Sequence, residues 1–238
     1  MISLQQTMVR YPRGKVALAG INLELHDGGF YYLVGESGAG KSTLLKAIYG
    51  GVRPTSGAMM VQDVDLRSAS RRKIRSLRRR IGIVFQDHRL LFSRTVYENV
   101  ALPLRVQGWK PDRLKARVGK VLEFVGLEDR MWSYPEALSG GEQQRVAIAR
   151  AMSAKPSIIL ADEPTGNLDV ATACRMLDYL VDLNRQGATV IMATHDMHLL
   201  QHHPANVVRL HGGALVEDGL ADRSVEHDEV HPEAFSHE

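Results

Sequence analysis

The chain has 238 residues, of which 44% are hydrophobic and 24% charged, and its formal net charge at pH 7 is +3. This composition is typical of a globular protein with a sizeable core, and the small net charge gives no argument for nucleic-acid binding. The single cysteine, Cys174, excludes an internal disulfide. No apolar run approaches the roughly 20 residues that a bilayer span needs. We therefore expect a cytosolic protein, unless a partner holds it at a membrane.

The first 34 residues show the alternation of apolar and polar positions that is typical of strands. Residues 2–9 and 21–25 are predicted to be half-exposed strands, and residues 30–34, Phe-Tyr-Tyr-Leu-Val, a buried one. Tyr11 lies between the first two strands and precedes a proline. Its ring either stacks on a nucleotide base or packs against the protein, and the sequence leaves both interpretations open.

A glycine-rich motif follows the buried strand. Residues 35–43 read Gly-Glu-Ser-Gly-Ala-Gly-Lys-Ser-Thr, which matches the G-x-x-x-x-G-K-[ST] pattern, and residues 43–49 have helical spacing. Glycines let backbone N–H groups wrap a phosphate, and the helix N-terminus adds its positive dipole end. Lys41 would face the β- and γ-phosphates, and the Ser42 hydroxyl would ligate Mg²⁺. The predicted nucleotide-binding residues here are Gly35, Glu36, Ser37, Gly38, Ala39, Gly40, Lys41, Ser42 and Thr43.

The chain then becomes strongly basic. Turn residues at 50–57 close the helix, and residues 58–61 are predicted to be a short strand. Contact with nucleic acid or an anionic membrane would explain the basic residues that follow, but no aromatic residue interleaves them, so a solvated helix face is the favoured interpretation. Gln86 comes at the C-terminal end of the predicted strand 81–85, where its side chain could bind Mg²⁺ or orient a water. The eight basic residues are Arg67, Arg71, Arg72, Lys73, Arg75, Arg78, Arg79 and Arg80.

Residues 89–154 have helical spacing and little strand pattern, which predicts a helical lobe inserted between strands. Helices are expected over 95–102 and 111–125. The lobe begins with an apolar cluster, Leu-Leu-Phe at 90–92. If this cluster is exposed, it suits the centre of an interface better than contact with water.

The lobe ends in a second glycine motif, Leu-Ser-Gly-Gly-Glu-Gln at 138–143. Ser139 and Glu142 have the spacing of a capping box, which predicts a helix start, and the helix is expected to run to about residue 154. Gly140 and Gly141 leave the N–H groups of the first turn uncovered. The motif is therefore a second predicted anion site, although a capping box alone is a common structural device.

Polar side chains also follow the next two predicted strands. The apolar segment 157–161 ends in Asp162 and Glu163. Asp162 fits a Mg²⁺ ligand of a P-loop enzyme, and Glu163 could polarise the attacking water as a general base. His195 follows the predicted strand 189–193, so its ring could reach a γ-phosphate.

The end of the chain carries fewer signals. A turn at 166–169 leads into a helix, and a hairpin is predicted over 207–217. Residues 221–238 are polar and acidic, which predicts a disordered tail. We therefore expect one domain over residues 1–220, with the core and β region at 1–88 and 155–220 and the helical subdomain at about 89–154.

Taken in order, these motifs resemble those of the ATP-binding cassette (ABC) family, over residues 1 to about 218. The resemblance implies a P-loop NTPase (RecA-like) α/β core with a parallel sheet, an N-terminal antiparallel β region and an inserted helical subdomain. It also implies ATP and Mg²⁺ as ligands, hydrolysis of ATP to ADP and phosphate, and Asp169 as a residue of the nucleotide site. The motifs are Tyr11, the glycine loop, Gln86, the signature at 138–143, Asp162-Glu163, residues 167–169 and His195.

The resemblance further implies partners. ABC subunits work as head-to-tail pairs, so Ser139 to Glu142 of one copy would close on ATP held by the glycine loop of the other. The segment after Gln86 would contact a cytoplasmic helix of an integral membrane partner. The chain would then lie at the cytoplasmic face of the inner membrane as a peripheral subunit.

Within the family, residues 86–91 and 94–104 are most similar to bacterial cell-division ATPases, which signal through a membrane partner to cell-wall hydrolases. Ser93 and Gly29 depart from that pattern. Residues 162–169 are shared with lipoprotein-release and macrolide-export ATPases, which is the alternative function. A soluble ABC ATPase acting on nucleic acid is disfavoured, because the chain has one cassette, a short insertion and no cysteine cluster.

Overall fold

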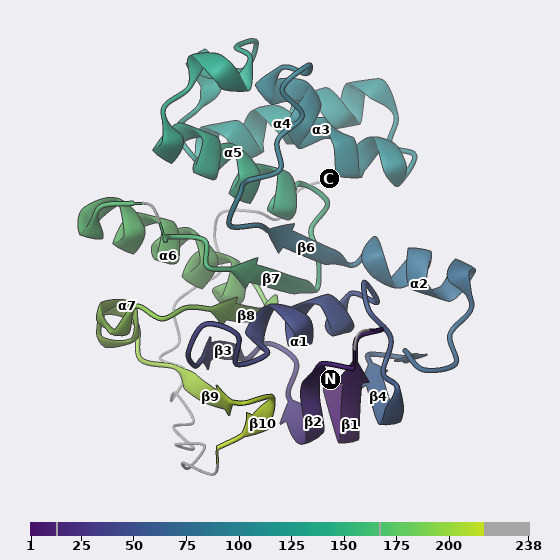
Figure 1. Cartoon of the computed structure of the whole chain (residues 1–238). Helices are drawn as coiled ribbons and strands as arrows, with labels where there is room; N and C mark the ends of the chain where they lie inside the picture. The colour runs from purple at the N-terminus through teal and green to yellow at the C-terminus, as the bar shows by residue number, and fades with distance from the viewer. Residues whose placement is uncertain (13, 167, 217–238) are drawn as a thin grey trace.

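The computed structural model describes residues 1–12, 14–166 and 168–216. An antiparallel sheet of four strands in the order β2-β1-β4-β5 occupies the lower part of the view in Figure 1. This sheet is the predicted N-terminal β region. Its strands are β1 (Ile2–Arg10), β2 (Val16–Leu25), β4 (Ser56–Val61) and β5 (Val64–Asp65).

The second sheet has six strands in the order β10-β9-β3-β8-β7-β6. All its neighbouring pairs are parallel except β10 with β9. The predicted parallel core is confirmed. The strands are β3 (Phe30–Val34), β6 (Ile81–Val84), β7 (Ile158–Asp162), β8 (Thr189–Ala193), β9 (Asn206–His211) and β10 (Ala214–Leu215).

The central strands of this sheet are buried on both faces, as the continuous apolar run at residues 30–34 predicts for β3. Successive side chains of β3 enter different cores, because neighbouring residues of a strand point to opposite faces. Tyr31 and Leu33 pack in the core that contains helix α1 (Lys41–Ile48) and the antiparallel sheet. Phe30, Tyr32 and Val34 pack in the core on the helical side. Helix α1 thus lies between the two sheets (Figure 1).

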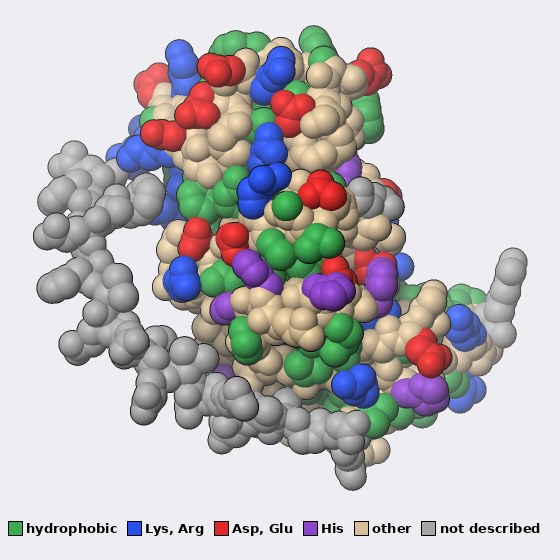
Figure 2. All heavy atoms as spheres, turned by 90° about the vertical axis from the view of Figure 1, so that its left-hand side faces the viewer, with side chains coloured by type: hydrophobic (Ala, Val, Ile, Leu, Met, Phe, Trp, Pro, Cys, Tyr) green, Lys and Arg blue, Asp and Glu red, His purple; other side chains and the backbone are tan. Residues whose placement is uncertain are grey.

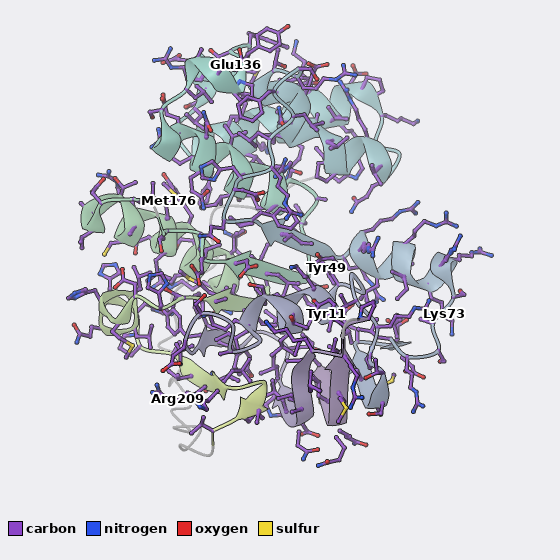
Figure 3. All side chains as sticks on the ribbon, viewed as in Figure 1. Tyr11, Tyr49, Lys73, Glu136, Met176 and Arg209 are labelled. Carbon is purple, nitrogen blue, oxygen red and sulfur yellow. The ribbon has the colours of Figure 1, made fainter. Side chains whose placement is uncertain are left out.

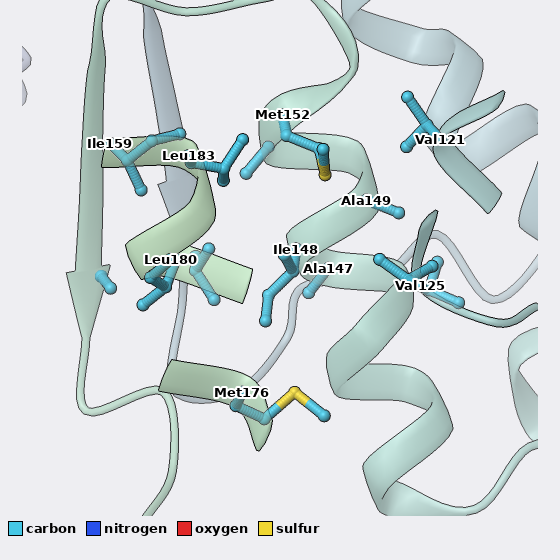
Figure 4. Packing of buried hydrophobic residues seen from close by; sticks show 14 of the residues in the cluster. Val121, Val125, Ala147, Ile148, Ala149, Met152, Ile159, Met176, Leu180 and Leu183 are labelled. Carbon is cyan, nitrogen blue, oxygen red and sulfur yellow. The ribbon is translucent and has the colours of Figure 1, made fainter. Parts of the chain in front are cut away.

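Three helices form the lobe at the top of Figure 1, where the sequence predicts a helical insertion. They pack against one another, and α5 also packs against β6. Figure 4 shows how side chains of α4, α5, β7 and α6 meet in one apolar cluster. The lobe helices are α3 (Val96–Val106), α4 (Pro111–Phe124) and α5 (Gly140–Ser153), with short 3-10 turns at Glu128–Arg130 and Pro135–Ala137. Helix α6 (Val170–Arg185) follows β7 and packs against α5 from outside the lobe.

Several predicted boundaries are wrong. Strand β2 begins at Val16 rather than residue 21, because Val16 and Leu18 already pair with β1. Helix α3 does not end at residue 102 but continues through Pro103 to Val106. The buried Leu104 anchors this last part, and the N–H of Gln107 donates to the carbonyl oxygens of Pro103 and Leu104. Strand β5 and helix α7 (Met197–His202) have no counterpart among the predicted elements.

Two further expectations fall outside the described residues. They are the acidic tail at 221–238 and single positions of two turns: residue 167 in the turn at 166–169 and residue 217 at the end of the predicted hairpin. Among the residues that the structure describes, no helix is both long enough and apolar enough to cross a membrane.

Candidate nucleotide-binding and catalytic site

Four parallel strands present the predicted site residues at one edge of the sheet. The glycine loop follows β3, Gln86 follows β6, Asp162 is the last residue of β7 and His195 follows β8. Since β3, β8, β7 and β6 are neighbours in that order and run parallel, their C-terminal ends share this edge. The fold therefore brings together segments far apart in sequence, as predicted.

The glycine loop is held so close to other backbone that side chains are excluded. A Cβ on Gly35 would lie 2.2 Å from the Leu210 carbonyl oxygen, and one on Gly40 2.6 Å from that of Ala17. Gly40, the residue before α1, also has a φ of 111°, which disfavours any other residue type. The motif glycines are thus required by the local geometry, besides leaving N–H groups free for a phosphate.

Lys41 is a buried cation at the start of α1. Its Nζ donates to the carbonyl oxygens of Gly35 at 2.7 Å and Glu36 at 3.2 Å. The same ammonium lies 3.6 Å from Oε1 of Glu163. A positive charge is therefore fixed inside the loop, where the predicted phosphate would lie.

The side chains of Ser42 and Asp162 are hydrogen-bonded to each other, although 120 positions separate them in sequence. Ser42 Oγ donates to Asp162 Oδ1 at 3.0 Å. Burial raises the pKa of the Asp162 carboxyl above its usual value, and the Ser42 hydroxyl offsets part of that effect. Both residues line a cavity of about 460 Å³ together with Gln86. These hydroxyl, carboxylate and amide oxygens are hard ligands of the kind that Mg²⁺ prefers.

Glu163 is held in an unusual backbone conformation between two other site residues. Its φ is 47°, in the left-handed region that few non-glycine residues adopt. Oε2 of Glu163 lies 3.5 Å from Nδ1 of the exposed His195, while Oε1 faces Lys41. Strain of this kind costs on the order of 1–3 kcal/mol and is concentrated at functional sites.

Tyr11 lies beside the glycine loop helix (Figure 3). Its hydroxyl oxygen is 3.3 Å from the hydroxyl oxygen of Thr43 in α1. The residue is partly buried, so the ring has both a packed side and an accessible one. Its position beside Thr43 agrees with both interpretations of the sequence.

The signature motif starts α5, and its predicted capping box is present. Ser139 Oγ accepts from the Glu142 N–H, and Glu142 Oε2 accepts from the Ser139 N–H at 2.8 Å. These hydrogen bonds lower the pKa of Glu142, with the Ser139 backbone N–H as the main cause. The N–H groups of Gly140 and Gly141 remain available. Among the described residues, no hydrogen bond or ion pair joins this motif to residues 35–43 of the same chain.

Asp169 has a structural role in the chain as it stands. Its Oδ1 accepts the N–H of Thr172 at 3.0 Å and so caps α6. The Thr172 N–H is also the main cause that lowers the pKa of Asp169. The side chain is exposed at a helix start, so a second contact, with a nucleotide, remains compatible with its position.

Three polar residues of the helical lobe position the site, and the sequence analysis missed them. Arg150 on α5 donates to the carbonyl oxygens of His88 and Arg89, each at 2.6 Å. Gln144, also on α5, donates to the carbonyl oxygen of Pro164, directly after Glu163. These contacts tie the signature helix to the segments after Gln86 and Glu163. Gln144 is fully buried in the fold, but nothing in the sequence distinguishes it from the neighbouring Gln143, so no sequence signal could have identified it.

The third residue is the fully buried Asn99 of α3. Its Oδ1 accepts the N–H of Leu91 at 2.8 Å, and its Nδ2 donates to the carbonyl oxygens of Leu91, Arg94 and Thr95. One side chain thus fixes the loop after Gln86. Asparagine is unfavourable inside a helix unless its amide makes hydrogen bonds. Its presence within the predicted helix 95–102 was therefore a sequence signal for such a role.

Asn99→Ala is expected to lower the free energy of unfolding by about 3 kcal/mol, because it leaves several buried backbone groups without partners. Urea denaturation measures the change. Gln107→Ala is the control: it removes an exposed hydrogen bond to the Arg79 carbonyl oxygen and one from Trp109 Nε1, and it is expected to cost about 1 kcal/mol. Equal effects of the two variants would contradict the role of Asn99.

Histidine side chains gather on the face of the molecule that Figure 2 shows. One histidine of the described residues, His202 on α7, has its Nε2 3.1 Å from Oδ1 of Asp178 on α6. Within the part of the chain that the structure describes, no three His, Cys, Asp or Glu side chains are grouped so as to hold a metal ion. A metal ion bound to the described residues would therefore need further ligands besides such side chains, for example the Ser42 hydroxyl, the Gln86 amide oxygen and a nucleotide.

The chain is similar to known proteins over nearly its whole length. A family model described as ABC transporter matches residues 18–166. The cell division ATP-binding protein FtsE of Bacillus subtilis (strain 168) is 44% identical over 218 residues, which cover 92% of this chain and 96% of that protein. The protein of the same name in Escherichia coli (strain K12) is 46% identical over 215 residues, covering 90% and 97% respectively.

A solved structure gives the same result for the fold. The dimeric, post-hydrolysis structure of the ATP-binding cassette MJ0796 bound to ADP and Pi has a TM-score of 0.83 and 34% sequence identity, covering 90% of this chain and 96% of that one. The fold of this chain is therefore similar to that of a cassette that holds nucleotide. The chain belongs to the ABC transporter family and is an ATP-binding, ATP-hydrolysing cassette.

Proposed function

We propose that the chain is the ATPase of an FtsE-type complex: two copies close on ATP and signal through an integral membrane protein during bacterial cell division. The main support is the similarity to FtsE proteins, which extends over at least 90% of each chain. The cell-division role is proposed from the names of these relatives, and the hydrolysis mechanism is proposed from the geometry of the site.

The nucleotide would be bound mainly by the glycine loop. Backbone N–H groups of residues 35–43 would surround the phosphates, and Lys41 would move from the loop carbonyls onto the β- and γ-phosphate oxygens. Tyr11 would stack on the base. The Lys41 ammonium would thus exchange carbonyl oxygens for phosphate oxygens, so it would have hydrogen-bond acceptors both before and after ATP binds.

Glu163 would act as the general base in hydrolysis. Its fixed backbone and its position between Lys41 and His195 aim the carboxylate at the space where the γ-phosphate would lie. His195 would contact that phosphate from the end of β8. Gln86, Ser42 and Asp162 would hold Mg²⁺, which would neutralise phosphate charge. A divalent cation would also compensate the burial of the Asp162 carboxylate.

Two copies would complete each site. Among the described residues, Ser139 to Glu142 make no hydrogen bond or ion pair with the glycine loop of their own chain, so their N–H groups would be available to a nucleotide on a second copy. The similar MJ0796 cassette is described as a dimer with ADP and Pi. Asp169 would lie at the same junction, at the start of α6.

A groove beside the loop after Gln86 would receive the membrane partner. The cavity has a volume of about 400 Å³ and lies between the β6 region and helices α3 and α5. Its apolar lining includes Leu102, Pro103 and Val106, and Val106 is well exposed. Arg150 lines the groove and also bonds to His88 and Arg89. A segment bound there would touch Arg150, whose hydrogen bonds reach the loop after Gln86.

The partner is proposed to be an FtsX-like integral membrane protein, which would place this chain at the cytoplasmic face of the inner membrane. Affinity capture of the tagged chain from detergent-solubilised membranes of its own cells tests this. We expect a four-span membrane protein by mass spectrometry. Capture of a solute permease instead, or of nucleic acid removed by nuclease, would contradict the proposal.

Leu91→Glu is expected to weaken recruitment by the membrane partner strongly and to leave ATP affinity nearly unchanged. Leu91 and Phe92 are 43% and 50% exposed, whereas Leu90 is buried, so the predicted apolar cluster is only partly at the surface. The new carboxylate would be buried in an apolar contact without a partner. Co-sedimentation with partner-containing membranes and nucleotide titration of the purified chain measure the two effects.

The matched control is Met60→Glu on β4, since Met60 is 39% exposed but belongs to the antiparallel sheet. Because coupling between two binding equilibria is reciprocal, the partner should also alter the nucleotide affinity of the unsubstituted chain, and less so that of Leu91→Glu. Normal sedimentation of Leu91→Glu would remove this loop from the interface.

A further inference from the structure

Helix α2 (Arg71–Arg78) carries one sign of charge on its whole exposed face. No acidic residue occurs between Asp65 and Asp87, while eight basic residues do. On the face that Figure 2 shows, acidic and basic side chains are interspersed instead. Ile74 and Leu77 are buried and anchor the helix, so its remaining positions are exposed to solvent.

Three of the eight basic side chains serve the fold. Arg67 donates to the Gly57 carbonyl oxygen, Arg80 pairs with Asp63 at 2.6 Å, and Arg78 donates to the carbonyl oxygens at the end of α1. Among the residues that the structure describes, the other five side chains make no hydrogen bond or ion pair. They are Arg71, Arg72, Lys73, Arg75 and Arg79.

Three of these unpaired cations stand where the helix itself disfavours them. Ser70 caps α2 by accepting the N–H of Lys73, so Arg71, Arg72 and Lys73 form the first turn. The N-terminus of a helix is its positive end and favours acidic residues, yet this turn contains none. Residues that destabilise their own helix or strand are expected where their side chains bind a ligand.

We propose that the exposed face of α2 binds the anionic headgroups of the lipid bilayer. Guanidinium and ammonium groups bind phosphate oxygens well, and each basic residue near an anionic surface adds to the attraction. Figure 3 labels Lys73 on α2, and residues 71–73 are all exposed to solvent. Headgroup binding would orient the cassette on the membrane before the partner is engaged.

The position of α2 favours a membrane over nucleic acid. Arg75, Arg78 and Arg79 line the apolar groove assigned above to the membrane partner, so the geometric part of the argument rests on that proposed function. A partner segment in the groove would bring α2 next to the bilayer surface. Residues 66–84 also contain no aromatic side chain that could stack on a base.

Co-sedimentation of the purified chain with partner-free vesicles tests the proposal. We expect binding to phosphatidylcholine vesicles that contain phosphatidylglycerol, no binding to pure phosphatidylcholine, and loss of binding as salt is raised. The triple variant Arg71→Glu, Arg72→Glu, Lys73→Glu should lower partitioning by at least about 100-fold. It should still fold, because glutamates suit the first turn and Lys73→Glu gives Ser70 the spacing of a capping box.

The control reverses three cations on α4 that are likewise exposed and unpaired within the described part of the chain: Arg113→Glu, Lys115→Glu, Lys120→Glu. It should bind vesicles several times more tightly than the α2 variant. Equal losses, or equal binding of the unsubstituted chain to both kinds of vesicle, would overturn the proposal. Binding to a DNA duplex, but not to anionic vesicles, that the α2 variant abolishes would assign the face to nucleic acid.

This experiment is independent of the partner assignment. The vesicles contain no protein, so their binding reports on the lipid surface alone. ATP hydrolysis by the purified α2 variant should equal that of the unsubstituted chain, because none of its three positions touches the nucleotide site. Failure to capture an FtsX-like protein would therefore contradict the proposed function and leave the vesicle result to be judged separately.

Discussion

Glu163→Gln is expected to lower the rate of ATP hydrolysis by about 10²- to 10⁴-fold, the usual loss when a general base is removed. ATP binding should persist, because the amide is isosteric with the carboxylate and Lys41 keeps its contacts with the loop carbonyls. ATP should then hold two copies together, since the γ-phosphate that bridges them is no longer removed. Steady-state hydrolysis and light scattering with Mg·ATP measure the two results.

The control for this variant is Glu123→Gln, an exposed carboxylate on α4 far along the chain from the site. It should hydrolyse ATP at the rate of the unsubstituted chain and should not accumulate as a dimer. A Glu163→Gln protein that stays monomeric at high concentration with ATP would count against the two-copy site. One that still turns over ATP normally would assign the base to another residue.

Lys41→Ala is expected to weaken ATP binding by at least about 100-fold, which corresponds to the loss of charge-assisted hydrogen bonds worth about 3 kcal/mol. The reason is positional: Lys41 is the buried cation that faces the interior of the loop. Titration with a fluorescent ATP analogue, together with a melting curve to check folding, measures the change.

Lys120→Ala provides the comparison for a lysine outside the site, and it should bind ATP normally. ATP should also raise the melting temperature of the unsubstituted chain and of Lys120→Ala, but not that of Lys41→Ala. An unchanged ATP affinity in Lys41→Ala would show that the glycine loop is not the nucleotide site.

The parts of the fold that the sequence predicted correctly are those in which local pattern and tertiary environment agree. Residues 30–34 are apolar throughout and lie between two cores, and residues 158–161 behave in the same way. Ser139 and Glu142 form their capping box within one turn of helix, so no distant residue decides it. The order of polar residues after strands was enough to predict a shared site, because parallel strands end at the same edge.

The rest depended on contacts between distant segments. Glu163 adopts a left-handed backbone that no local preference predicts, and it is followed by Pro164, which Gln144 holds from the other lobe. Val16 joins β2 only because Arg10 pairs with it. Leu90, Leu91 and Phe92 are equally apolar, yet Asn99 fixes the loop so that only the first is buried. Periodicity carries no information about such choices.

The strand order has a consequence for how the protein is made. Strand β3, which leads into the glycine loop, hydrogen-bonds to β8 and β9, and residues 189–211 are the last part of this sheet to leave the ribosome apart from β10. The glycine loop is synthesised early, but β8 and β9, the neighbours of β3 in the sheet, are made only when translation is nearly finished. Nascent chains that stop before residue 189 should therefore be unable to retain ATP, which spares the cell half-made cassettes that compete for nucleotide.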